Sequence, residues 1–178
     1  PAAYAVDPIT TVETTGTGYA VTVADNFEVT ARITNAALNG GNETVKFRIV
    51  DADAKLTAVG IDDTNDAGAA GADGLLTVND DTGYLAQANF TDNVAIVDTG
   101  AAVAGTAYEL MLDPSAAAAA FSVTVQAWVD FDGDNAIDTA AGSEEVAGPV
   151  RTVTFYPAGD ITWSTSLKAA PALGDAAL

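Results

Sequence analysis

The residues best suited to chemistry lie in one short segment, 130–138, which reads Asp-Phe-Asp-Gly-Asp-Asn-Ala-Ile-Asp. It places carboxylates at every second position, at Asp130, Asp132 and Asp134, and a further one at Asp138. Carboxylates this close repel one another unless a cation lies among them, and a ligand set made only of oxygen suits calcium. The segment therefore predicts a calcium site in a tight loop. An acidic turn without an ion is the alternative.

The flanking residues indicate that this loop joins two β-strands. Residues 121–129 before it alternate apolar and polar side chains, and residues 150–156 after it read as another strand. The loop is therefore predicted to be the tip of a hairpin on a β-protein.

The same period-two alternation recurs along the chain, as is typical of strands with one face on a core and one in water. In residues 45–49, for example, Lys46 and Arg48 are expected on the water face. Clusters of Gly, Asn and Asp separate the segments. Many short strands with such turns predict an all-β fold, an antiparallel β-sandwich. The other alternating segments are residues 27–33, 84–90 and 108–112.

We expect residues 1–157 to form this sandwich, with a loop insertion at 51–74 that has room for a short strand at 56–61. The aspartates of the insertion are either a second cation site or solvated loop residues, and the second reading is favoured. Residues 113–120 are expected to form a single helical turn. Residues 158–178 are expected to be a linker, the first strand of a following repeat, or a strand exchanged with a neighbouring subunit, and a frayed tail is the alternative.

Composition limits the function. Twenty-five acidic residues against six Lys and Arg give a net charge of −19, which disfavours nucleic acid and anionic membranes as partners. No apolar run is long enough for a membrane span, so no direct membrane insertion is expected. The absence of His and Cys removes Ser-His-Asp and Cys-His catalysis and His-ligated zinc. We therefore expect a protein that is not an enzyme.

What remains for an enzyme is a pair of carboxylates, or a Ser or Thr with a Lys. A glycosidase needs two carboxylates in contrasting environments across a cleft, and a solvent-facing acidic turn does not provide them. Trp128 and Trp163 could stack on a sugar, but single aromatic residues in strands more often pack in the protein.

The acidic loop resembles the calcium loops of EF-hand and dockerin proteins, and loops of the form FVDxDGDGxID…E in bacterial immunoglobulin-like domains. Asp130, Asp132 and Asp134 match positions one, three and five of the calcium loop. The resemblance implies that Ala136 offers a backbone carbonyl and that Asp138 is the ninth, often water-bridged, position. Asn135 replaces a usual glycine, which is tolerable because Asn accepts a left-handed backbone.

The last ligand departs from this pattern. Ala141 stands where a bidentate glutamate belongs, and Glu144 or Glu145 is expected to supply it after a short insertion. The implied metal ligands are Asp130, Asp132, Asp134, Ala136, Asp138 and Glu144, with calcium as the cofactor.

The strand pattern resembles a bacterial immunoglobulin-like (Big-type) domain, and the composition resembles surface-layer and other repetitive cell-surface proteins. This implies a non-enzymatic structural module of an extracellular assembly at the cell surface, with copies of itself or other surface proteins as partners. A bacteriophage virion protein, such as a decoration, tail or fibre component, is the first alternative. An adhesin or carbohydrate-binding module with a glycan ligand is the second.

Overall fold

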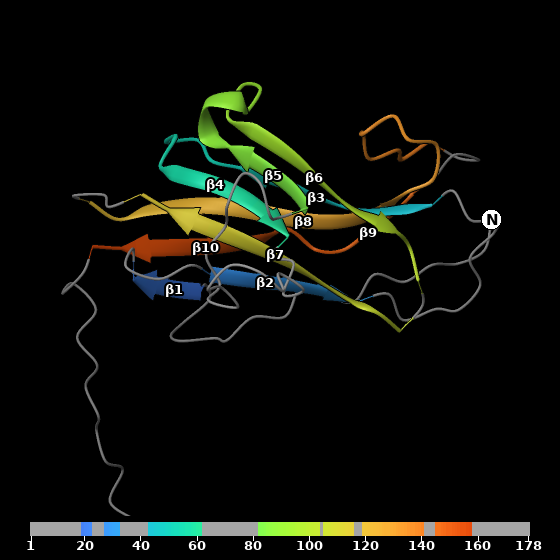
Figure 1. Ribbon diagram of the computed structural model, residues 1–178, viewed down its shortest axis with the longest axis horizontal. Helices are drawn as coiled ribbons and strands as arrows, with labels where there is room; N and C mark the ends of the chain where they lie inside the picture. Colours follow the sequence, from blue (N-terminus) through green and yellow to red (C-terminus); the bar gives the residue numbers. More distant parts are fainter. Residues whose placement is uncertain are drawn as a thin grey trace, which may run out of the picture.

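The computed structural model describes residues 19–22, 27–32, 43–61, 82–103, 105–115, 119–140 and 145–157. These residues form ten strands and one 3-10 turn (Figure 1). The elements are β1 Tyr19–Thr22, β2 Phe27–Arg32, β3 Thr44–Val50, β4 Leu56–Ile61, β5 Thr82–Ala86, η1 Gln87–Asn89, β6 Val94–Ala101, β7 Ala107–Pro114, β8 Phe121–Asp130, β9 Val146–Ala147 and β10 Arg151–Tyr156.

The strands form two sheets. One has six strands in the order β1-β10-β8-β3-β6, with the short β9 also paired to β8. The other has four strands in the order β2-β7-β4-β5. All described strand pairs are antiparallel except β1 and β10, which run parallel. The all-β expectation is confirmed.

The two sheets share one hydrophobic core, which makes the fold a β-sandwich. Alternate side chains of each strand point inward, because successive residues of a strand face opposite sides of the sheet. In β8 the inward set is apolar from Phe121 to Val129, and the Phe121 ring stacks on Phe155 of β10 with centroids 5.0 Å apart. Other fully buried members are Val45, Phe47 and Ile49 of β3, Val29 of β2, Val59 of β4, and Leu110 and Leu112 of β7.

A tyrosine fixes the connection that carries the chain from β6 in one sheet to β7 in the other. The hydroxyl of Tyr108 donates to the carbonyl of Ala101 at 2.9 Å and accepts from the N–H of Val103 at 2.6 Å. The ring is 8% exposed. These two hydrogen bonds satisfy backbone groups at the end of β6 and just after it, and so tie the start of the crossover to β7.

Most expected strands are present, with small shifts at their ends. The segment expected at 84–90 is shorter, because β5 ends at Ala86 and residues Gln87–Asn89 form the 3-10 turn. The sequence analysis did not predict β1, β6 or β9. Within the described residues, the longest helical element is this three-residue turn, and no helix could span a bilayer.

The range expected as a loop insertion, 51–74, contains a strand that belongs to the sandwich itself. β4 lies between β7 and β5 in the four-stranded sheet, and its Leu56 and Val59 are core residues. Asp51 is fully buried and accepts hydrogen bonds from the backbone N–H groups of Lys55 and Leu56 at 2.7 Å, so it is a turn residue. Residues 62–74 lie outside the described residues.

Two further expectations concern segments with residues outside the described part. At the start of the helical turn expected at 113–120, Asp113 and Pro114 belong to β7, and residues 116–118 are outside the described part. Residues 158–178, expected to be a linker or an additional strand, are also outside it.

Candidate metal centre in the loop after β8

The acidic loop leaves the end of β8 and is closed at its base by β9. Val129 of β8 pairs with Val146 of β9, and the N–H of Gly148 donates to the carbonyl of Ala127 at 2.8 Å. Phe131 packs against the hydrophobic core and so anchors the start of the loop. The loop projects from one end of the sandwich, on the right in Figure 1.

Asp130 organises the first half of the loop. It is the last residue of β8 and is 0% exposed. Its Oδ1 accepts hydrogen bonds from the N–H groups of Asp132 at 3.2 Å and Gly133 at 2.6 Å, and its Oδ2 accepts from that of Asn135 at 3.2 Å. The backbone bends sharply to bring these donors together, with φ of 82° at Gly133 and 65° at Asn135. The expected left-handed conformation at Asn135 is confirmed.

The next two aspartates repeat the same local bond. Oδ1 of Asp132 accepts from the N–H of Asp134 at 3.1 Å, and Oδ1 of Asp134 accepts from the N–H of Ala136 at 2.7 Å. An aspartate that binds the backbone two residues ahead stabilises a turn. The spacing of every second residue therefore has a structural function in addition to any cation binding.

Lys46 of β3 supplies a cation that the sequence analysis did not anticipate. Its Nζ lies 2.8 Å from Oδ2 of Asp130, donates to Oδ1 of Asn135 at 2.6 Å, and lies 3.8 Å from a carboxylate oxygen of Asp98 on β6. Lys46 was expected on the water face of β3, but it is 5% exposed. Its side chain does leave the core face, yet the loop covers it, because Asp130 and Asn135 lie over it.

Glu145 ties the two ends of the loop together. Its Oε1 accepts from the N–H of Phe131 at 2.8 Å, and its Oε2 accepts from the N–H of Asp138 at 3.2 Å. Its own N–H donates to the carbonyl of Asp138 at 2.9 Å. Glu145 is 8% exposed, whereas the other candidate, Glu144, lies outside the described residues. Of the two glutamates left open by the sequence, Glu145 is the one placed at the loop.

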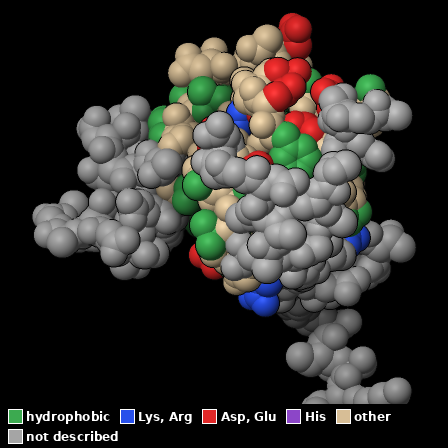
Figure 2. Space-filling model, turned by 90° about the vertical axis from the view of Figure 1, so that its right-hand side faces the viewer, with side chains coloured by type: hydrophobic (Ala, Val, Ile, Leu, Met, Phe, Trp, Pro, Cys, Tyr) green, Lys and Arg blue, Asp and Glu red, His purple; other side chains and the backbone are tan. Residues whose placement is uncertain are grey.

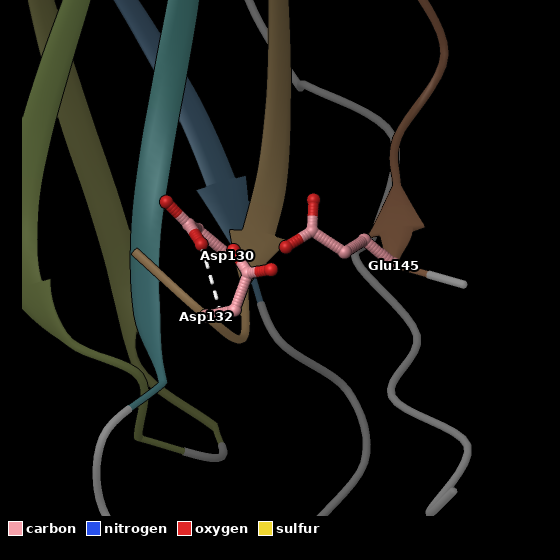
Figure 3. Close-up of side chains that lie close together, drawn as sticks. All are labelled: Asp130, Asp132 and Glu145. Atoms are coloured by element: carbon pink, nitrogen blue, oxygen red, sulfur yellow. Dashed lines mark hydrogen bonds between the residues drawn. The ribbon is translucent and has the colours of Figure 1, made fainter. Parts of the chain in front are cut away.

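The structure brings the carboxylates into two groups that could hold a metal ion. Asp130, Asp132 and Glu145 form one, and Asp132, Asp134 and Asp138 form the other, each with one oxygen per residue within 4.8 Å of the rest. Figure 3 shows the carboxylate of Glu145 pointing toward the two aspartates at the end of β8. In Figure 2, which faces this end of the molecule, acidic side chains gather near its top. Asp132 belongs to both groups.

The two buried carboxyl groups differ in their electrostatics. Burial by itself raises the pKa of Asp130, but hydrogen bonds from Lys46, Gly133 and Asn135 and the charge of Lys46 outweigh it and hold the pKa below the usual range. The pKa of Glu145 is raised, first by burial, and the charges of Asp130 and Asp132 add to the rise against its two backbone hydrogen bonds. The charge of Asp130 is thus offset by the ammonium of Lys46, whereas no Lys or Arg in the described residues offsets the charge of Glu145.

The other predicted ligands are placed as follows. Asp132 and Asp134 are exposed, and Asp138 is partly buried. Among the described residues, no Lys or Arg side chain lies within 4.0 Å of these three carboxylates or of Glu145. The N–H of Ala136 is used by Asp134, which leaves its carbonyl as the group available to an ion.

Comparison with known proteins does not assign the chain to a family. No protein-family model matches the chain, and no curated protein matches it. Among solved structures, it is similar to AvmM, which catalyses macrocyclization in alchivemycin A biosynthesis, with 11% identity over 91% of each chain and a TM-score of 0.38. A similarity of this size does not establish a shared fold or activity.

Proposed function

We propose that the chain is a non-enzymatic structural module of an extracellular assembly, an immunoglobulin-like sandwich whose acidic loop is stabilised by calcium. One observation carries the calcium part: Asp132 lies in both carboxylate groups, and no described Lys or Arg neutralises it. Calcium binds oxygen ligands at 2.3–2.6 Å, so ligands on opposite sides of one ion lie up to about 5 Å apart. In each group the three oxygens lie within 4.8 Å of one another, which is compatible with this requirement.

The electrostatics support the same ion. Burial is the main cause of the raised pKa of Glu145, and the negative charges of Asp130 and Asp132 add to it, so these carboxylates repel one another. A divalent cation between Asp132 and Glu145 would remove this repulsion. The oxygen-only ligand set favours calcium over softer metals.

The arrangement of strands supports an immunoglobulin-like sandwich. In the constant-type immunoglobulin fold, strands G, F and C share one sheet, and strands B and E pair in the other. β10, β8 and β3 correspond to the first set, and β2 and β7 to the second. The chain departs from this order between β3 and β7, because β4 and β5 join the four-stranded sheet before β6 returns to β3.

A structural role is supported by the nature of the site. The loop lies at one end of the sandwich, where a bound ion would stiffen a connection between strands. Trp128 is 0% exposed, so it cannot serve as the sugar-stacking platform that an adhesin or carbohydrate-binding module would need. This removes one of the two tryptophans considered for that alternative.

Thermal unfolding in calcium and in chelator tests the proposal. Calcium at 100 times its dissociation constant should stabilise the wild-type protein by about 2.7 kcal/mol, because a ligand that binds only the folded state shifts the unfolding equilibrium toward it by mass action. Asp132→Asn should abolish most of this gain. Asp53→Asn, which removes an exposed aspartate outside the loop, should retain it. An unfolding temperature that calcium does not change would contradict the calcium site.

The assembly is tested separately. Electron microscopy of the purified chain with and without calcium should reveal sheets or filaments if the module associates with copies of itself. Chains that stay monomeric at every concentration would count against self-assembly without bearing on calcium.

A further inference from the structure

We infer that Lys46 is an internal counter-ion of the acidic loop, which keeps the loop folded without metal and at the same time weakens its affinity for calcium. This inference rests on the proposed calcium site. A residue of a different strand, outside the loop, would then set the calcium concentration at which the site is filled.

The contacts of Lys46 explain how it supports the metal-free loop. Its ammonium lies 2.8 Å from Oδ2 of Asp130 and 2.6 Å from Oδ1 of Asn135. Asp130 is the residue that gathers the N–H groups of the turn, and Asn135 has a left-handed backbone. Lys46 therefore binds two residues on which the bend of the loop depends. A buried carboxylate without such a partner would be costly.

The same contacts oppose a divalent ion. Oδ2 of Asp130 and Oδ1 of Asn135 are oxygens of the kind that calcium binds, and the ammonium already occupies both. An ion that includes Asp130 in its ligand set must share this carboxylate with a positive charge, and like charges a few ångströms apart repel. Lys46 is 5% exposed, so it has little room to move its charge into water.

The counter-ion divides the loop into two unequal parts. Asp130 is paired with Lys46, while Asp132, Asp134 and Asp138 meet no described Lys or Arg within 4.0 Å. The group of Asp132, Asp134 and Asp138 is therefore the part of the loop whose negative charge an external cation would neutralise. Removal of Lys46 should open Asp130 to the ion as well and increase the number of charged ligands.

The test compares Lys46→Met with wild type by calorimetric calcium titration and by thermal unfolding in chelator. Met preserves the length of the side chain and removes its charge. We expect the calcium dissociation constant to fall by roughly tenfold or more, since the affinity of such loops depends on their ligand charge. In chelator the variant should unfold at a lower temperature than wild type, and calcium should narrow or reverse this gap.

Arg48→Met is the matched control. Arg48 lies two residues further along β3 on the same face, is exposed, and pairs with Gln126 rather than with the loop. Its replacement changes the net charge of the protein by the same amount. It should leave the calcium affinity within about twofold of wild type. If both variants gain affinity equally, the effect comes from overall charge and the role of Lys46 is refuted.

Lys46→Gln provides a second variant if Lys46→Met does not fold, because its amide still donates a hydrogen bond to Asp130. Equal affinities of wild type and both Lys46 variants would overturn the inference and leave the calcium site standing. Calcium binding by the variants alone would support the inference and contradict calcium stabilisation of the natural chain. Absence of binding in all of them would overturn both proposals.

Discussion

Lys46 and Trp128 lie opposite each other on β3 and β8, on the side of the six-stranded sheet that faces away from the core, and both are buried. Trp128 also pairs with Ala147 of β9 on its other side. β9 is paired within the same sheet, whereas the acidic loop lies over Lys46 on this face through Asp130 and Asn135. The face therefore carries a second buried layer on what would otherwise be a water-facing surface. The cation and its carboxylate partner lie in this layer.

The first prediction concerns Trp128 as the largest side chain of that layer. Trp128→Ala should lower the free energy of unfolding by about 3–5 kcal/mol, because it leaves a large cavity. Trp128→Phe should cost less, since the buried indole N–H has no hydrogen-bond partner in the part of the chain that the structure describes. Urea unfolding measures both. Equal stability of the Ala variant and wild type would show that this layer does not form.

The second prediction concerns the buried pair of Lys46 and Asp130. In chelator, Asp130→Asn should destabilise the protein by about 3–5 kcal/mol, because it leaves the buried ammonium with only the exposed and more distant carboxylate of Asp98. In a Lys46→Met background the same substitution should cost less. The difference is the coupling free energy of a double-mutant cycle, expected at roughly 0.5–3 kcal/mol. Equal costs in the two backgrounds would mean that the two residues act independently.

The third prediction separates the two glutamates that follow the loop. Glu145→Gln should weaken calcium binding and lower stability, because an amide can replace only one of the carboxylate's two acceptor oxygens for Phe131 and Asp138. Glu144→Gln should have a smaller effect on both quantities. Calcium titration and thermal unfolding of the two variants side by side decide between them. A larger effect of the Glu144 substitution would reverse the assignment.

The fourth prediction concerns pH and a residue away from the loop. Burial raises the pKa of Asp113 on β7 above its ordinary value of 3.8. The folded protein therefore keeps this proton to a higher pH than the unfolded chain, and the contribution of Asp113 to stability falls as the pH rises through the raised pKa. Asp113→Asn removes this loss. The free energy of unfolding of the variant minus that of the wild type should therefore be greater at pH 7 than at pH 3. A relative stability that is independent of pH would contradict it.

Much of the sandwich follows from local patterns. The alternation in β2, β3, β7 and β8 could be recognised because a strand turns every second side chain to the same face, and this period is visible in a single segment. β6 was missed because its sequence, Val-Ala-Ile-Val-Asp-Thr-Gly-Ala, begins with four apolar residues without alternation. β1 and β9 are too short for a period to be seen.

The acidic loop likewise has features that depend on neighbouring residues in the sequence and one that depends on the tertiary fold. The sequence by itself determined that Asp130, Asp132, Asp134 and Asp138 share one loop, and that Asn135 could take the left-handed bend, because these depend on neighbours along the chain. Tertiary structure alone decided that Lys46 meets Asp130. The two residues are 84 positions apart, and only the register of β3 against β8, together with the fold of the loop over that face, brings the ammonium to the carboxylate.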